Sequence, residues 1–186
     1  MAESKTFALN FGEAIAFVAP GFLAFKAVSY FSGTAQSWLA AAATGDLTVG
    51  TFLFVLLAST ALGIAVSGFR ALLIDNLFHC RWLKGWRIGR PDFKWNQLDG
   101  AKLESFKFMN EGYYRYFQFY SNSLIALLIL LVARFSKTPR PAWTMWYWLA
   151  AMLVVGTLFW SAHDSYSRYA KAVNELFSGA SQTEEP

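Results

Sequence analysis

Apolar residues are gathered into four long blocks along the chain, and polar residues collect between them. The blocks cover residues 7–31, 47–69, 116–133 and 142–162. Each block reaches or approaches the roughly 20 residues that a helix needs to cross about 30 Å of hydrocarbon. The pattern therefore predicts an all-α integral membrane protein with four transmembrane helices.

The same pattern divides the chain into four parts. Residues 1–74 hold the first two transmembrane helices with a short outer loop, and residues 119–165 hold the last two. Residues 75–118 form a basic and aromatic module, which is predicted to be a helical loop on the cytoplasmic side between spans two and three. Residues 166–186 are predicted to form a cytoplasmic tail.

Local features predict how some of these segments fold. Pro20-Gly21 predicts a kink in the first span, and good helix formers at residues 36–43 predict a short surface helix in the outer loop. The aliphatic run at residues 124–132 is expected to face lipid. Residues 98–118 carry apolar side chains at three- and four-residue spacing, which predicts an amphipathic helix running into the third span. These side chains are Leu103, Phe106, Met109 with Asn110, Tyr113 and Phe117.

Composition and charge agree with this topology. Hydrophobic residues make up 55% of the chain and charged residues 15%, whereas a soluble domain carries roughly 45–50% and about 25%. With the N-terminus inside, twelve lysine and arginine residues lie on the cytoplasmic side and three lie outside. Because positively charged loops stay on the cytoplasmic side, both termini are expected there.

Two features within the spans are candidates for a conduit or for helix packing. Ser59, Gly63 and Ser67 recur every four residues in the second span and share one helical face, where small side chains let another helix approach closely. This face either lines a pore or self-associates, or it packs against another span of the same subunit. Glu13 in the first span either reaches the nearer interface or faces a water-filled interior and selects cations.

Residues 81–95 alternate cations with large flat rings. Cations bind phosphates and rings stack on bases, so this composition suits a single-stranded nucleic acid or a nucleotide ligand. A juxtamembrane segment resting on anionic lipid has the same composition and is the alternative. The residues concerned are Arg81, Trp82, Lys84, Trp86, Arg87, Arg90, Lys94 and Trp95.

No sequence motif indicates an enzyme. Asp75 and His79 share a helical face, but one carboxylate and one histidine without a second spaced pair fall short of a zinc signature. Hydrogen bonding at a helix end is their expected role. We therefore expect no catalytic site, no metal and no cofactor.

Two runs of residues resemble a group of small bacterial four-span membrane proteins. They are Pro20-Gly21-Phe22 with Ser29-Tyr30-Phe31-Ser32 in the first span, and residues 113–122 at the start of the third. With its basic aromatic module, the layout is similar to the membrane effector of the Hailong anti-phage defence system. The resemblance implies a homo-oligomeric ion channel of the bacterial inner membrane, held closed by single-stranded DNA that a partner nucleotidyltransferase makes.

A second hypothesis comes from a different class of protein. The chain would be a non-conducting membrane scaffold or accessory subunit that recruits a cytoplasmic partner. The aromatic residues of the same module would then form the protein contact.

Overall fold

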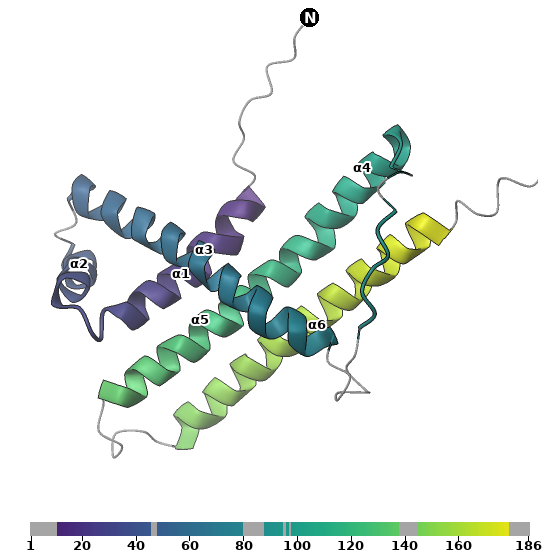
Figure 1. The fold of residues 1–186 in the computed structure, drawn as a ribbon. Helices are drawn as coiled ribbons and strands as arrows, with labels where there is room; N and C mark the ends of the chain where they lie inside the picture. Colours follow the sequence, from purple (N-terminus) through teal and green to yellow (C-terminus); the bar gives the residue numbers. More distant parts are fainter. Residues whose placement is uncertain are drawn as a thin grey trace, which may run out of the picture.

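The computed structural model describes residues 11–45, 48–79, 88–94, 96, 98–137 and 145–178, with side chains from residue 15 onward. Every regular element in these ranges is a helix, so the predicted all-α class is confirmed (Figure 1). In chain order the elements are α1 (Phe11–Val28), α2 (Gly33–Thr44), α3 (Val49–His79), α4 (Gly100–Met109), η2 (Asn110–Tyr114), α5 (Arg115–Lys137) and α6 (Met145–Ser178).

In the part of the chain that the structure describes, three helical rods are long and apolar enough to cross a membrane. They are Val49–His79, Gly100–Lys137 and Met145–Ser178. Helices α1 and α2 pass the same test only as a pair, and they are bent by 119° relative to each other. These apolar helices indicate a membrane protein with three candidate spans, or four if the bent pair counts as one.

The bend between α1 and α2 follows from the residues at the ends of α2. Ser32 has an extended backbone, and its hydroxyl accepts a hydrogen bond from the Ala35 N–H, which starts the new helix. Gly45 ends that helix with a φ of 83°, a left-handed conformation that favours glycine. The short helix predicted at residues 36–43 is therefore confirmed.

Helix α1 continues through Pro20 as a single helix. A proline has no backbone N–H, so the carbonyl of Ala16, four residues earlier, loses its usual helical donor. The side-chain amide of Asn122 in α5 donates to this carbonyl at 3.2 Å, in a fully buried position. The polar group that Pro20 leaves free is thus satisfied by a helix more than 100 residues away.

Helix α5 lies at the centre of the molecule, with α1 on one side and α6 on the other, and α3 crosses over it (Figure 1). Every residue from 121 to 126 is buried. The expectation that residues 124–132 face lipid is therefore wrong for the first part of that run, although Leu128, Ile129 and Val132 are exposed. A continuous aliphatic run shows that a helix is apolar, but it does not say how many neighbouring helices cover it.

Helices α1 and α3 approach each other to backbone contact. A Cβ atom built on Gly21 would lie 1.7 Å from the Ser59 carbonyl oxygen, and one built on Gly63 would lie 2.0 Å from the Phe17 carbonyl oxygen. Neither position can hold a larger residue without moving a helix. The two glycines therefore allow this close crossing.

Elements α4, η2 and α5 form one continuous rod, as predicted for a helix running into the third span. The π-helical turn η2 inserts an extra residue per turn, which rotates the apolar face by one position. Tyr114 packs on Phe117 and Tyr169, with ring centroids 5.8 and 5.1 Å apart, whereas Tyr113 is exposed. The predicted position of Tyr113 on the packed face is therefore wrong, and Tyr114 takes its place.

Candidate ligand pocket beside the end of α3

Only two of the eight cations and aromatic residues singled out in residues 81–95 can be located. Arg90 and Lys94 are exposed on the extended segment 88–94. The other six, Arg81, Trp82, Lys84, Trp86, Arg87 and Trp95, lie outside the described residues. The structure therefore places a small part of the predicted binding run.

Segment 88–94 is attached to three helices. The N–H of Ile88 donates to the Phe78 carbonyl at the end of α3 (3.0 Å), and the N–H of Asp92 donates to the Asn174 side chain on α6 (3.1 Å). The ring of Phe93 packs edge-on against Phe106 of α4, with centroids 6.0 Å apart. These contacts hold the exposed residue Arg90 next to the end of α3.

A cavity of about 460 Å³ opens between this segment, the end of α3, η2 and α6. We call it the tyrosine pocket. Its lining combines aromatic rings with hydrogen-bonding groups and one arginine. The lining residues are Ala71, Asp75, Asn76, His79, Arg90, Pro91, Phe93, Tyr114, Tyr166 and Tyr169.

A packed aromatic cluster supports the pocket. Tyr166 is buried and its ring lies 4.7 Å from Phe117, while Phe78 contacts both rings at 6.2 Å. The ring of Tyr169 is tilted against that of Tyr114 at 5.1 Å. Because these rings come from α3, α5, α6 and η2, the cluster ties the pocket wall to four elements.

A part-buried ion pair, in which the arginine is buried and the aspartate side chain is 31% exposed, lies at one side of the pocket. Arg70 is 5% exposed, its guanidinium donates to Asp75 Oδ1 at 3.0 Å, and it lies 5.0 Å from the centre of the Phe117 ring. Arg70 Nε has no hydrogen-bond partner in the described part of the chain. Asp75 is thus the main compensation for a buried charge and also lines the pocket.

His79 connects α3 to α6. Its Nδ1 is hydrogen-bonded to the backbone carbonyl of Asp75, and its Nε2 lies 3.3 Å from the hydroxyl of Tyr166. A carbonyl only accepts, so Nδ1 carries a proton and donates to it, which leaves Nε2 as the ring atom facing the Tyr166 hydroxyl. Hydrogen bonding near the helix end, the role expected of Asp75 and His79, is what the structure shows.

The chemistry of the tyrosine pocket suits a flat polar ring attached to an anionic group. Tyr114 presents a half-buried ring, Asn76 and His79 present hydrogen-bonding atoms, and Arg90 presents a positive charge, while the rings of Tyr166 and Tyr169 are buried behind Tyr114 in the aromatic cluster. Within the described ranges, no three histidine, cysteine, aspartate or glutamate side chains are grouped as a metal site would require.

Sequence reasoning missed the aromatic wall of the pocket. The three- and four-residue spacing places Tyr113, not Tyr114, on the packed face, and it gives no role to Tyr166 or Tyr169. A usable signal exists, because Tyr166 and Tyr169 are three residues apart and share a helical face. Their proximity to Tyr114 and Arg90 depends on tertiary packing.

The small-residue face of α3 contacts α1 of the same chain. Ser59 is 1% exposed, Gly63 is buried against Phe17, and Ser67 is half-buried. Of the two alternatives that the spacing allowed, the structure shows packing against another helix of the same chain. Glu13 lies in the first turn of α1, and its side chain is outside the described set.

Comparison with protein-family models, with curated proteins and with solved structures gives no match for this chain.

Proposed function

We propose that this chain is the subunit of a homo-oligomeric ion channel in the bacterial inner membrane, controlled by an oligonucleotide that binds at the tyrosine pocket. Single-stranded DNA is the first candidate ligand. The proposal rests mainly on one observation, that the pocket is built on α3, η2 and α6, whose rods continue into the apolar part of the molecule. Antiviral defence is the role that such a channel would serve.

A four-span topology is part of the proposal. Helix α1 has 18 residues and is about 27 Å long, which is close to the thickness of the hydrocarbon core. Helix α2 turns away by 119° and fits a helix lying at the outer surface. With both termini cytoplasmic, α4 and the C-terminal half of α6 extend together on the inner side, opposite α2 (Figure 1).

The pocket chemistry supports an oligonucleotide over a lipid headgroup. A base stacks on tyrosine rings and offers several hydrogen-bonding atoms, and its phosphate pairs with arginine. A lipid headgroup needs the cation but gains little from the ring of Tyr114. The rim residue Arg90 would take the phosphate and Tyr114 would stack on the base.

The pocket also offers a way to couple ligand binding to the conduit. Asp75 and His79 belong to α3, and Tyr166 and Tyr169 belong to α6. A ligand that contacts both helices changes the balance between closed and open states if it fits one of them better. Glu13 and the face of Ser59, Gly63 and Ser67 are the proposed contributors to the conduit or to its packing.

Binding of labelled single-stranded DNA to the protein in nanodiscs without anionic lipid tests the ligand. Tyr114→Leu should weaken binding at least about fivefold, since stacking contributes roughly 1–3 kcal/mol per base. Tyr113→Leu is the matched control, because this neighbouring ring is exposed outside the pocket. Equal loss in both variants, or no binding by the wild type, would refute the proposal.

A salt series tests the charge contribution. Log affinity falls as log salt rises, and removing one phosphate contact should make this slope shallower by about 0.7 for a single strand. Arg90→Ala should show this change and Lys107→Ala, an exposed cation on α4, should not. Ion flux from loaded liposomes, measured with and without the oligonucleotide, then tests the channel itself.

A membrane scaffold remains the second candidate, supported by exposed aromatic residues outside the pocket. Phe108 is 73% and Tyr116 57% exposed, on α4 and at the start of α5. Exposed rings at this end of the molecule suit a protein contact. A partner that co-purifies with the wild type but not with Phe108→Ser, together with no ion flux, would favour it. A nucleotidyltransferase gene beside this one would instead favour the channel.

A further inference from the structure

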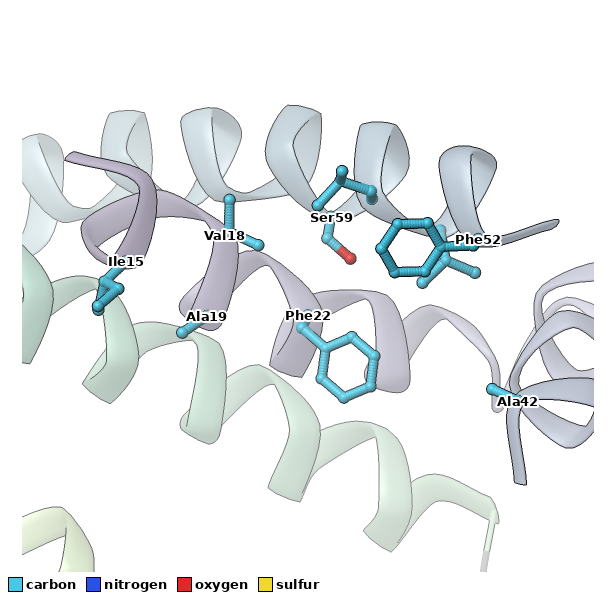
Figure 2. Close-up of a pocket in the computed structure, with 9 residues that line it drawn as sticks. Ile15, Val18, Ala19, Phe22, Ala42, Phe52 and Ser59 are labelled. Atoms are coloured by element: carbon cyan, nitrogen blue, oxygen red, sulfur yellow. The ribbon is translucent and has the colours of Figure 1, made fainter. Parts of the chain in front are cut away.

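Two apolar grooves lie on the membrane half of the molecule. The larger, of about 640 Å³, lies between α1, α2 and α3, where Phe22 and Phe52 border it (Figure 2). The smaller, of about 400 Å³, lies between the end of α1 and the second half of α5, and all of its lining side chains are apolar. Apolar lining does not select an occupant by itself, so the groups at the rim decide what a groove can bind.

One end of the smaller groove carries a cation. The ammonium nitrogen of Lys137, the last residue of α5, lies 5.1 Å from the centre of the Phe31 ring, which lines the groove. Lys137 is exposed, and no carboxylate within the described ranges forms an ion pair with it. Arg134, one turn earlier on α5, lies instead over Tyr147 of α6 at 5.7 Å. The charge of Lys137 is therefore placed beside the groove and is open to an anion from outside the chain.

The groove has about the length of one leaflet of a bilayer. Leu128, at its inner end, and Lys137 are nine residues apart on the same helix, which corresponds to about 14 Å, or roughly half of the 30 Å hydrocarbon core. Phe135 packs against Trp148 of α6 with ring centroids 4.6 Å apart, and tryptophan is typical of the boundary between membrane and water. When α5 crosses a bilayer, Lys137 thus lies at the depth of the headgroups and the groove lies among acyl chains.

The lining of the groove is open to lipid. Val132 and Phe31 are 65% and 61% exposed, so acyl chains of the bilayer can reach both. Lipid chains are as apolar as this lining, so a chain in the groove gains close packing but does not distinguish one lipid from another. Discrimination comes from Lys137, which attracts a negatively charged headgroup. A zwitterionic headgroup carries a cation of its own, which offsets this attraction.

We propose that this groove is a binding site for an anionic phospholipid, with one acyl chain between α1 and α5 and the headgroup phosphate on the Lys137 ammonium. The lipid contacts both helices at the end of α5 that lies away from the tyrosine pocket. The site requires that the chain is in a membrane, and it depends neither on a channel nor on an oligonucleotide.

Native mass spectrometry of the full chain in mild detergent, titrated with phosphatidylglycerol or with phosphatidylcholine of the same acyl chains, tests the charge. The wild type should bind phosphatidylglycerol about fivefold more tightly, and Lys137→Gln should lose this preference. Lys26→Gln is the matched control, because this exposed cation lies near the same end of α1, on the Tyr30 ring and outside the groove lining. Equal affinities of the wild type for the two lipids, or an equal loss in both variants, would overturn the proposal.

Filling the groove tests where the acyl chain lies. Val28→Trp places a large ring in the groove and should weaken phosphatidylglycerol binding, whereas Val154→Trp on α6 should not. The two valines are 39% and 44% exposed, so neither change introduces a ring into the packed core. Unchanged affinity in Val28→Trp would overturn the site, and a lower oligomer mass in the same variant would show that a second copy covers the groove instead.

An excess of inorganic phosphate distinguishes a lipid site from a simple anion site. Phosphate should not displace phosphatidylglycerol, because the acyl chain holds the lipid in the groove. Displacement by phosphate would show that Lys137 binds an anion without the groove, and it would also overturn the proposal.

Discussion

The two ends of this molecule are held together in different ways. In the apolar half, α1 and α3 touch through backbone at Gly21 and Gly63, and large side chains point outward. At the opposite end, large rings such as Phe78, Phe117 and Tyr166 pack inward beside the buried guanidinium of Arg70. Lipid is as apolar as a leucine side chain, so the membrane half gains from close backbone approach rather than from burying bulk. The aromatic end follows the rules of a water-soluble core.

The largest effect is expected from enlarging the smallest residue at the α1–α3 contact. Gly21→Ala places a methyl group 1.7 Å from the Ser59 carbonyl oxygen, so one helix must move. We expect a loss of about 3 kcal/mol or more, seen as a lower melting temperature or loss of monodisperse protein in detergent. Gly33→Ala, where a Cβ meets nothing within 4 Å, should be close to wild type. A stable Gly21→Ala protein would show that the helices are not in backbone contact.

The next effect tests the ion pair at the aromatic end. Asp75→Asn leaves the buried Arg70 guanidinium without its compensating charge, at a cost of about 3 kcal/mol because Arg70 is almost fully buried. Asp164→Asn removes the partner of Arg168 in an exposed pair and should change stability by less than about 0.5 kcal/mol. Thermal unfolding of both variants gives the comparison. Equal losses would mean that burial does not distinguish the two pairs.

A smaller effect is expected at the one polar contact between α1 and α5 described above. Asn122→Leu removes the donor to the Ala16 carbonyl and should cost about 1–2 kcal/mol. Pro20→Ala restores a backbone N–H that can satisfy the same carbonyl, so Asn122→Leu should cost less in that background. A double-mutant cycle on melting temperatures measures this difference. Strict additivity would show that Asn122 does not substitute for the missing proline donor.

The smallest effect concerns the link between α3 and α6. Tyr166→Phe keeps the ring in the aromatic cluster and removes only its hydroxyl bond to His79, which is 3.3 Å long. The expected loss is about 0.5–1 kcal/mol. In His79→Ala the same change should have little effect, because the acceptor is already absent. A large loss in both backgrounds would assign the hydroxyl another role.

The sequence predicted where the helices lie better than it predicted which of their faces pack against other helices. The helix α2 and the continuous rod from α4 into α5 followed from local propensity and periodicity. The predicted exposure of residues 124–126 to lipid was wrong, because burial depends on how many helices pack around α5. The predicted place of Tyr113 on the packed face was wrong, because the π-helical turn η2 shifts that face by one residue. The tyrosine pocket could be predicted only in part, through Arg90, since its walls come from residues far apart in the chain.

What the sequence determined by itself is the class of protein, because the length and apolarity of a segment are local properties that decide whether a helix can cross a membrane. Which faces meet was decided by tertiary structure alone. Pro20 leaves a carbonyl free, but nothing near it in the chain points to Asn122 as the donor. Likewise, the Arg70–Asp75 pair could be read as a surface contact until packing buried it under Phe117. Such pairings depend on the positions of several helices at once, and local pattern carries no information about those positions.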